Sequence, residues 1–364
     1  MIPYFDYRPE WTRIQGEIDE ALRRVLASGQ LILGPEVQAF EREIAALQGL
    51  RGAVGVNSGT DALILALRAL EVGSGDEVIT VANAGPPTVA AIRAAGAVAR
   101  FVDVDPETLL MDPSGLERAI TSKTRCILPV HLYGQPAPLA PILEIAERHG
   151  VEVVEDCAQA QGALYRSRRV GGWGRIGCFS FYPTKNLGAY GDGGICVTDD
   201  RRLEERLRML RMYGFRNDRH SHCEGLNSRL DELQAAILRV KLRQLDRALE
   251  ERRAIAMRYR EALAGSAYRL TEPAAEGSHT YHLFVVRTER RAAVIEALRR
   301  AEIGFGIHYE EPVHRMEAYR FLGYDEGDLP VTEEASRRVL SLPIYPGLEE
   351  QAVESVIRTL LAAA

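Results

Sequence analysis

The chain has 364 residues, of which 46% are hydrophobic and 26% are charged, and its formal net charge is −6. This length predicts two domains with a large buried core, and the negative charge argues against a general nucleic-acid-binding protein. The five cysteines are odd in number and scattered along the chain, so neither a disulfide framework nor a zinc ribbon is predicted, and we expect no metal site.

The N-terminal sequence MIPYFDYRPEW has neither the basic start nor the apolar run of a secretion signal. No stretch of the chain approaches the roughly 20 apolar residues that a membrane helix needs. We therefore expect a soluble, cytoplasmic protein that has no membrane or nucleic-acid partner.

The first two thirds of the chain alternate short β-branched runs with helical patterns. The expected strands are residues 78–81, 98–102, 126–130, 151–154, 178–182 and 195–198. Between two of them, Leu139, Ile142, Leu143 and Ala146 have helical spacing. This alternation predicts an α/β fold with a mainly parallel sheet sandwiched by helices, whose ligands gather beyond the carboxyl ends of the strands.

The last third has a different pattern. Ser228 and Asp231 form an approximate capping pattern for a long helix that continues to Gly265. A strand (281–287), a helix (289–301) and a second strand (304–309) are expected after it. We therefore predict a large domain with an N-terminal arm over residues 1–246 and a smaller α+β domain over residues 247–364.

Three segments of the large domain carry residues suited to chemistry. A strand-like lead runs into Asn57-Ser58-Gly59-Thr60, where a helix begins, and free amides at such a place favour an anion, although a plain helix cap would look the same. Glu155-Asp156 ends a strand, where a buried carboxylate would need a cationic partner and a surface acid would not. Lys185 lies in a glycine-bordered loop between two strands, and a buried setting there would partly deprotonate its amine.

In this order and spacing the segments resemble the DegT/DnrJ-type sugar aminotransferases, a branch of the aspartate-aminotransferase fold (fold type I), along nearly the whole chain. By this resemblance Lys185 binds pyridoxal 5′-phosphate covalently, Asp156 pairs with its pyridine nitrogen, and Gln159 contacts its phenolic oxygen. Pyridoxamine 5′-phosphate is then the intermediate form of the cofactor. The residues that resemble the phosphate-binding group are Ser58, Gly59, Thr60 and Ser180.

Two further features follow from the same resemblance. Asn227, in the segment GLNSRLDELQAA (225–236), resembles an asparagine that reaches the phosphate from the neighbouring subunit, which implies a homodimer with shared active sites. Family members commonly stack an aromatic residue on the pyridine ring from the segment that matches residues 82–91. This chain has Gly85, Pro86 and Pro87 there and no aromatic residue, so the stacking residue is unassigned.

The expected substrates are L-glutamate as amino donor and a nucleotide-linked keto sugar as acceptor. The residues that resemble the lining of the sugar pocket are HLYG (131–134), Tyr182, Tyr190, His308, Tyr309 and His314, with a structural histidine in the small domain as the alternative for His308 or His314. Arg229 is a candidate for a substrate carboxylate or phosphate, with a subunit-interface ion pair as the alternative. Arg211, Arg216 and Arg219 are candidates for the nucleotide diphosphate, with a solvated loop as the alternative.

The segments VHLYGQPA and NSRLDELQAAILRVKL look most similar to enzymes that aminate 3-keto-6-deoxyhexoses linked to thymidine diphosphate in deoxysugar biosynthesis. Amination of a 4-keto sugar or a cyclitol by the same mechanism stays open, as does a catalytically silent regulatory member of the fold. Lys185 argues against a pyridoxamine-dependent sugar dehydratase, in which the lysine position resembles a histidine. The absence of a Gly-x-Gly-x-x-Gly motif after the early strands argues against a nicotinamide dehydrogenase.

Overall fold

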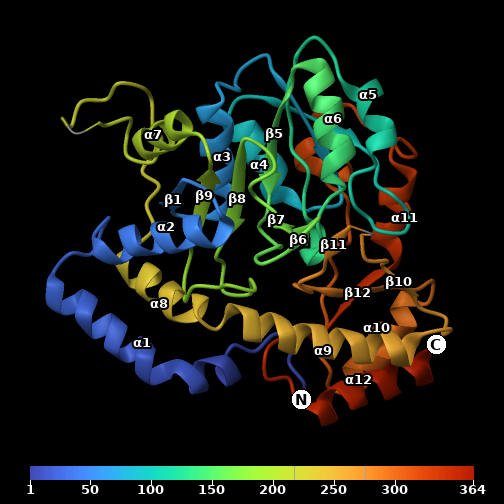
Figure 1. Cartoon of the computed structure of the whole chain (residues 1–364). Helices are drawn as coiled ribbons and strands as arrows, with labels where there is room; N and C mark the ends of the chain where they lie inside the picture. The colour runs from blue at the N-terminus through green and yellow to red at the C-terminus, as the bar shows by residue number, and fades with distance from the viewer. Residues whose placement is uncertain (217, 275) are drawn as a thin grey trace.

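The centre of the computed structural model, which describes residues 1–364 except Asn217 and Ala275, is a seven-stranded sheet with the order β1-β9-β8-β5-β4-β2-β3 (Figure 1). Its strands are β1 (Gly52–Val56), β2 (Glu77–Val81), β3 (Val98–Val102), β4 (Thr124–Ile127), β5 (Glu152–Asp156), β8 (Ile176–Ser180) and β9 (Gly194–Thr198). Strands β3, β2, β4, β5 and β8 are parallel neighbours, and only β9 pairs antiparallel, with β8 and β1. The expected mainly parallel α/β sheet is confirmed.

Helices cover both faces of this sheet because neighbouring strand residues point to opposite sides. In β1, Val54 packs into one apolar core with α3, whereas Ala53 packs into a second core with α2. The helices of this region are α1 (Arg8–Ser28), α2 (Pro35–Gln48), α3 (Gly59–Ala69), α4 (Pro86–Ala94), α5 (Leu116–Ala119), α6 (Leu139–His149), α7 (Arg201–Leu210) and α8 (Glu232–Leu242). The helical spacing between Leu139 and Ala146 is thereby confirmed as α6.

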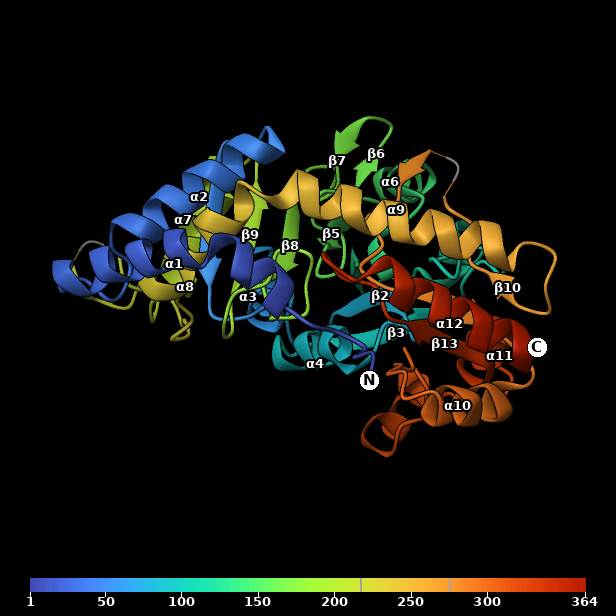
Figure 2. The ribbon, with the colours of Figure 1, turned by 90° about the horizontal axis from the view of Figure 1, so that it is seen from below.

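The last third of the chain forms a smaller three-stranded antiparallel sheet with the order β10-β12-β13. Its elements are α9 (Leu245–Leu263), β10 (Arg269–Leu270), β12 (Phe284–Arg287), α10 (Arg291–Arg300), α11 (Pro330–Arg338), β13 (Val339–Leu342) and α12 (Glu350–Ala363). Helix α9 runs from the end of α8 to α12, so it links the two regions (Figure 1, Figure 2). The domain boundary near residue 247 lies in its first turn and stays a prediction.

Short elements complete the fold. A third, small sheet has the order β11-β6-β7 and joins both regions of the chain. Its strands are β6 (Leu164–Tyr165), β7 (Arg168–Arg169) and β11 (Gly277–Ser278), and short 3-10 turns occupy Pro113–Gly115, Leu132–Gly134, Val313–Arg315 and Glu317–Leu322. Within the described part of the chain, no helix is both long enough and apolar enough to cross a membrane.

The structure corrects two expectations about the last third. The helix predicted from Ser228 to Gly265 is two helices, α8 and α9, and Ser228 does not cap it. Its hydroxyl donates to Asp61 Oδ2 (2.7 Å) and accepts from the Asn57 N–H (3.1 Å), so it ties this segment to the start of α3. Residues 304–309 form no strand. Gly306 makes a single bridge to Ser341, and the backbone then turns toward the cavity described below.

Candidate active site

A cavity of about 270 Å³ lies at the carboxyl end of β5, where the parallel sheet was expected to place its ligand. The residues that line it are Ser58, Gly59, Thr60, Leu63, Ala84, Pro87, Thr88, Val130, Asp156, Ala158, Gln159, Ser180, Tyr182, Lys185, Asp192 and Tyr309. Six separate stretches of the chain therefore meet here. Every cofactor residue predicted from the sequence lines this cavity except Asn227.

The first wall is the turn from β1 into α3. Ser58 is the N-cap of α3, and its side chain accepts a hydrogen bond from the Asp61 N–H (3.1 Å). A Cβ atom on Gly59 would lie 2.5 Å from the Cβ of Ser180, so only glycine allows the helix to begin against that strand end. Free amides of a helix N-terminus beside the hydroxyls of Thr60 and Ser180 form a site suited to a phosphate.

Asp156, the last residue of β5, also lines the cavity and is buried. It accepts hydrogen bonds from Thr88 Oγ1 (2.8 Å) and from the Ala158 N–H (3.1 Å). Burial raises the pKa of this carboxyl, and the hydrogen bonds and the charge of Lys185 only partly oppose the rise. A buried carboxylate of this kind is stabilised by a cationic ligand that pairs with it.

Lys185 approaches the cavity from a tight turn after β8. Its own N–H donates to the Tyr182 carbonyl (2.8 Å), and a Cβ on Gly188 would lie 2.5 Å from the Pro183 carbonyl oxygen, so glycine is required in this turn. Burial lowers the pKa of the Lys185 amine to about 8, although the charge of Asp156 opposes this shift. A sizeable fraction of the amine is therefore neutral near pH 8 and able to act as nucleophile or base.

Gln159 has a defined orientation in this cavity. Its Oε1 accepts from the Tyr133 N–H (2.8 Å), which leaves Nε2 to donate, and Nε2 lies 3.3 Å from the Tyr309 hydroxyl. A ligand oxygen in the cavity would therefore meet an N–H donor at Gln159.

A second cavity of about 320 Å³ adjoins the first and shares Gln159, Tyr182, Lys185 and Tyr309 with it. The residues that it adds are Tyr4, Phe5, Thr184, Arg252, His282, Leu283, His308 and Ile344. Burial, followed by the charge of Lys185, lowers the pKa of His308 to about 4, so this imidazole is neutral near pH 7. The second cavity therefore contains the neutral imidazole of His308 and several hydroxyl groups together with the reactive amine of Lys185.

Sequence reasoning missed the part that the N-terminal arm and α9 contribute to this second cavity. Tyr4 stacks on His308 with ring centroids 5.9 Å apart, and Arg252 is fully buried although it lies within a strongly charged helical stretch. The Arg252 Nη1 donates to the carbonyls of Tyr281, His282 and Ile344. No local pattern distinguishes this arginine from its solvated neighbours, because its partners are backbone carbonyls distant in sequence.

Several predicted substrate residues lie outside both cavities. Tyr190 faces α1, with its ring 5.4 Å from that of Tyr7, and Arg229 Nη1 contacts the Met212 sulfur (3.6 Å). The His314 Nε2 pairs with Glu333 Oε1 at 3.1 Å, and His314 is only 1% exposed. We therefore leave His314 out of the pocket proposed below.

Residues 131–134 line neither cavity, and their hydrogen bonds stabilise the structure around the cavities. His131 Nδ1 accepts from the Ala137 N–H (2.9 Å), so Nε2 carries the proton that it donates to Glu155 Oε2 (3.0 Å). Glu155 also accepts the N–H groups of Gly171, Trp173 and Gly174. Burial alone would raise the pKa of Glu155, but these bonds hold it below its ordinary value. Together with Cys157 these side chains have the spacing of metal ligands, yet both His131 nitrogens and both Glu155 oxygens already have partners.

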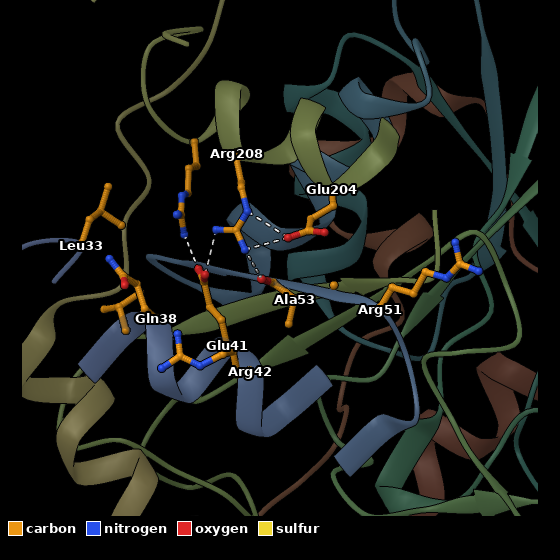
Figure 3. A pocket seen from close by; sticks show the side chains of 11 residues that line it. Leu33, Gln38, Glu41, Arg42, Arg51, Ala53, Glu204 and Arg208 are labelled. Carbon is orange, nitrogen blue, oxygen red and sulfur yellow. Dashed lines mark hydrogen bonds and ion pairs between the residues drawn. The ribbon is translucent and has the colours of Figure 1, made fainter. Parts of the chain in front are cut away.

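A third pocket, of about 330 Å³, lies between α2, β1 and α7 and is rich in charge (Figure 3). Glu41 accepts from Arg208 (2.8 Å) and Arg211 (2.5 Å), and Glu204 also pairs with Arg208 (2.8 Å). Because carboxylates from the chain itself already neutralise these arginines, the pocket is a structural ion cluster. Arg211 is therefore not free to bind a nucleotide diphosphate, whereas Arg216 and Arg219 are exposed in the loop that follows.

Comparison with known proteins agrees with this geometry. The model of the DegT/DnrJ/EryC1/StrS aminotransferase family matches residues 12–361. Two similar curated proteins are dTDP-3-amino-3,4,6-trideoxy-alpha-D-glucose transaminase of Streptomyces venezuelae and the erythromycin biosynthesis sensory transduction protein EryC1 of Saccharopolyspora erythraea. The first is 46% identical over 98% of this chain and 94% of its own length, and the second is 46% identical over the full length of both chains.

Solved structures give the same result. The crystal structure of S. venezuelae DesV in complex with a ketimine intermediate superposes with a TM-score of 0.97, at 46% identity over 99% of this chain and 98% of that chain. NtdA from Bacillus subtilis with bound cofactor PMP superposes with a TM-score of 0.89, at 31% identity over 96% of this chain and 81% of that chain.

Proposed function

This chain belongs to the DegT/DnrJ/EryC1/StrS aminotransferase family, and from that premise we propose that it moves an amino group from L-glutamate to the 3-keto carbon of a deoxyhexose linked to thymidine diphosphate. It is a pyridoxal-phosphate-dependent sugar aminotransferase. The proposal concerns the substrates and the residues that handle them. The observation that carries it is a single cavity in which the Lys185 amine, the buried Asp156 carboxylate and the α3 N-terminus meet.

The lining of the cavity fits pyridoxal phosphate. The ligand has an anionic phosphate, a basic ring nitrogen and an aldehyde. The cavity offers an amide-lined helix start, a partly neutral amine and a buried carboxylate that, among the described residues, has no cationic hydrogen-bond partner. We assign the phosphate to Ser58, Gly59, Thr60 and Ser180, the ring nitrogen to Asp156, the phenolic oxygen to Gln159 and the aldehyde to Lys185. When bound, the cofactor supplies an electron-accepting ring that makes the Cα proton of an amino acid removable.

The residues of the chain then act in two half-reactions. Lys185 Nζ accepts the proton that leaves the Cα atom of the amino donor in the first. In the second it returns a proton to the sugar carbon that receives the nitrogen. Asp156 stays ionised and stabilises positive charge on the ring nitrogen throughout, which is an electrostatic role in both directions.

The sugar is proposed to lie in the second cavity, against Tyr182 and His308. Imidazole and phenol groups hydrogen-bond sugar hydroxyls while their rings cover apolar faces of the sugar. We infer the 3-keto position and the thymidine nucleotide of the substrate from the name of the S. venezuelae relative, whose similarity to this chain extends over nearly its whole length. Arg229 lies away from the cavities of its own chain, and we propose it for a contact across a subunit interface. Tyr190 packs against α1 of its own chain and is left out of the sugar pocket.

We also propose a homodimer with shared active sites. Asn227 is exposed and does not line the cavity of its own chain, although the neighbouring Ser228 is bonded to the start of α3. An exposed asparagine next to the helix that receives the phosphate is well placed to serve a second copy of the chain.

The test is a two-stage assay with purified protein. Protein loaded with pyridoxal phosphate should absorb visible light, and glutamate alone should convert that absorption to the pyridoxamine form. A 3-keto nucleotide sugar should restore it, while its 4-keto isomer should do so at least about tenfold more slowly. A faster reaction with the 4-keto isomer or with a keto cyclitol would replace the proposed acceptor by that compound.

The runner-up is a regulatory protein that has lost catalysis. The name of the S. erythraea relative, a sensory transduction protein, is the observation that favours it. The intact set of Lys185, Asp156 and Gln159 in one cavity weighs against it, and absence of both half-reactions in cofactor-loaded protein would support it.

A further inference from the structure

Gly85 lies between Ala84 and Pro87, two residues that line the cavity, and it has no side chain to present there. Gly85 is the N-cap of α4 and has φ 84° and ψ 172°, a conformation that residues with a Cβ rarely adopt. A Cβ atom built there would lie 2.8 Å from Cζ and 3.0 Å from Cε1 of Tyr309. The Tyr309 ring therefore occupies the space into which a side chain at position 85 would extend.

Tyr309 is held in that place from two sides. Its hydroxyl accepts from Gln159 Nε2 (3.3 Å), and the preceding carbonyl, that of His308, accepts from the fully buried Tyr133 hydroxyl (2.6 Å). The His308 ring is in turn fixed by Ser341, whose Oγ lies 2.8 Å from Nδ1. An aromatic ring restrained by so many partners loses little freedom when a ligand packs against it.

The position of this ring in the cavity indicates what it touches. Tyr309 lines the cavity that also contains Asp156, Thr88 and Pro87, and Thr88 lies on the same helix that Gly85 begins. The Thr88 hydroxyl is bonded to Asp156, so the Gly85 end of α4 lies beside the carboxylate that is assigned to the pyridine nitrogen. Gln159, which the Tyr309 hydroxyl contacts, is the residue assigned to the phenolic oxygen of the same ring.

We propose that Tyr309, admitted by the missing side chain of Gly85, packs its phenol ring on the pyridine ring of the cofactor and positions it. This inference rests on the proposed function and extends it. The stacking group then comes from the last third of the chain, while the residues that pair with the cofactor come from the first two thirds. An offset aromatic pair of this kind stabilises binding beyond the area that it buries.

The test measures cofactor binding directly. Apoprotein of the wild type, Tyr309→Leu and Tyr309→Phe is titrated with pyridoxal phosphate, and the dissociation constant and the circular dichroism of the bound cofactor are recorded. Tyr309→Leu should weaken binding about tenfold and change the cofactor dichroism, while Tyr309→Phe, which keeps the ring, should stay within about threefold of the wild type. Tyr324→Leu is the matched control, because this tyrosine packs on Phe101 and lies outside both cavities.

A second pair of variants tests the contact with Gly85. Gly85→Ala should weaken cofactor binding in the wild type, because its Cβ collides with the Tyr309 ring, and should cost less in the Tyr309→Leu background. An unchanged dissociation constant and dichroism in Tyr309→Leu, with only the Michaelis constant for the sugar raised, would overturn this inference and leave Tyr309 as a substrate residue. Failure of the wild type to bind any cofactor would instead contradict the proposed function.

Discussion

Two ionisable side chains, those of Lys185 and Asp156, line the same cavity, and burial shifts the pKa of each. Burial disfavours the charged form of each, so the pKa of Lys185 falls and that of Asp156 rises. Each charge partly stabilises the other, yet neither forms an ion pair with the other among the contacts of the described residues. A ligand that reacts with the amine and pairs with the carboxylate would satisfy both groups at once. Two buried ionisable groups with shifted pKa values and no ion pair between them are typical of a catalytic site and uncommon as a purely structural arrangement.

Removal of the Lys185 amine tests the first of these roles. Lys185→Ala should lower turnover by at least about a thousandfold, because no other lysine is found among the described residues that line the cavity and could move the proton. Mass spectrometry after borohydride reduction should show the cofactor attached to the Lys185 peptide in the wild type and to no peptide in the variant. Lys123→Ala, an exposed lysine, is the control and should retain full activity. Turnover that persists in Lys185→Ala would remove the assignment.

The depressed pKa of Lys185 also predicts a pH dependence. Only the neutral amine attacks an aldehyde, and the neutral fraction rises with pH up to the pKa of about 8. The rate at which apoprotein captures pyridoxal phosphate covalently should therefore rise about tenfold per pH unit below 8 and level off above it. Stopped-flow absorption measures this rate. A plateau that begins only near pH 10, the range of an ordinary lysine, would show that burial does not shift this amine.

At the scale of elements, the ion cluster of Figure 3 fixes the strand that carries the phosphate segment. Glu41 of α2 accepts from the Gly55 N–H of β1 (2.8 Å), and Arg211, just after α7, donates to both Glu41 and the Gly55 carbonyl (2.9 Å). Gly55 stands three residues before Ser58. The cluster therefore holds β1 between α2 and α7 and determines where α3 begins.

Loss of the central carboxylate should destabilise the whole fold. Glu41→Ala leaves buried Arg211 without its charge partner, which costs about 3–5 kcal/mol of unfolding free energy, and it should also weaken cofactor binding through β1. Urea denaturation of the apoprotein measures the first effect. The control is Glu20→Ala, which removes an exposed pair with Arg24 and should change stability by less than about 0.5 kcal/mol. A loss below about 1 kcal/mol in Glu41→Ala would contradict this role of the cluster.

The elements also show where sequence patterns succeed. The strand before Asp156 contains a β-branched pair, Val153 and Val154, and the strand before Lys185 is mostly apolar, so their presence was predictable, although β8 begins and ends two residues before the expected 178–182. Strand β1 was predicted only as a strand-like lead into Asn57, without bounds, because Gly52 and Gly55 are poor strand formers and pairing with β9 overrides their preference. The break between α8 and α9 carries no proline or glycine signal.

The residues of the candidate site also fall into two groups, those that sequence patterns predict and those that they do not. Asp156, Lys185 and the Ser58 turn were predictable because each lies at a strand end or helix start, and the topology of a parallel sheet brings such ends together. Arg252 and the contact of Tyr309 with Gly85 were not predictable. They depend on how the last third of the chain folds back on the sheet, and no local spacing encodes that packing.

At the scale of the whole molecule, the position of Asn227 requires a second chain if this residue binds the phosphate. It is exposed, lies outside the cavity of its own chain and adjoins Ser228, which is bonded to the first turn of α3. In a closed two-fold dimer each subunit would lend Asn227 to its partner. Removal of one charge-assisted hydrogen bond to the phosphate in Asn227→Ala should weaken cofactor binding about tenfold, and light scattering of the wild type should give the mass of two chains.

Sharing of sites is tested most directly by mixing two defective variants. Homodimers of Lys185→Ala lack the amine in both sites, and homodimers of Asn227→Ala lack the phosphate contact in both. A mixed dimer contains one site that has its own Lys185 and receives Asn227 from the other chain, so it is intact. At a cofactor concentration that leaves Asn227→Ala largely empty, an equal mixture allowed to exchange subunits should regain about a quarter of wild-type activity, because half of the dimers are mixed and each has one intact site in two. Activity that never exceeds the mean of the two separate variants would show that each chain completes its own site.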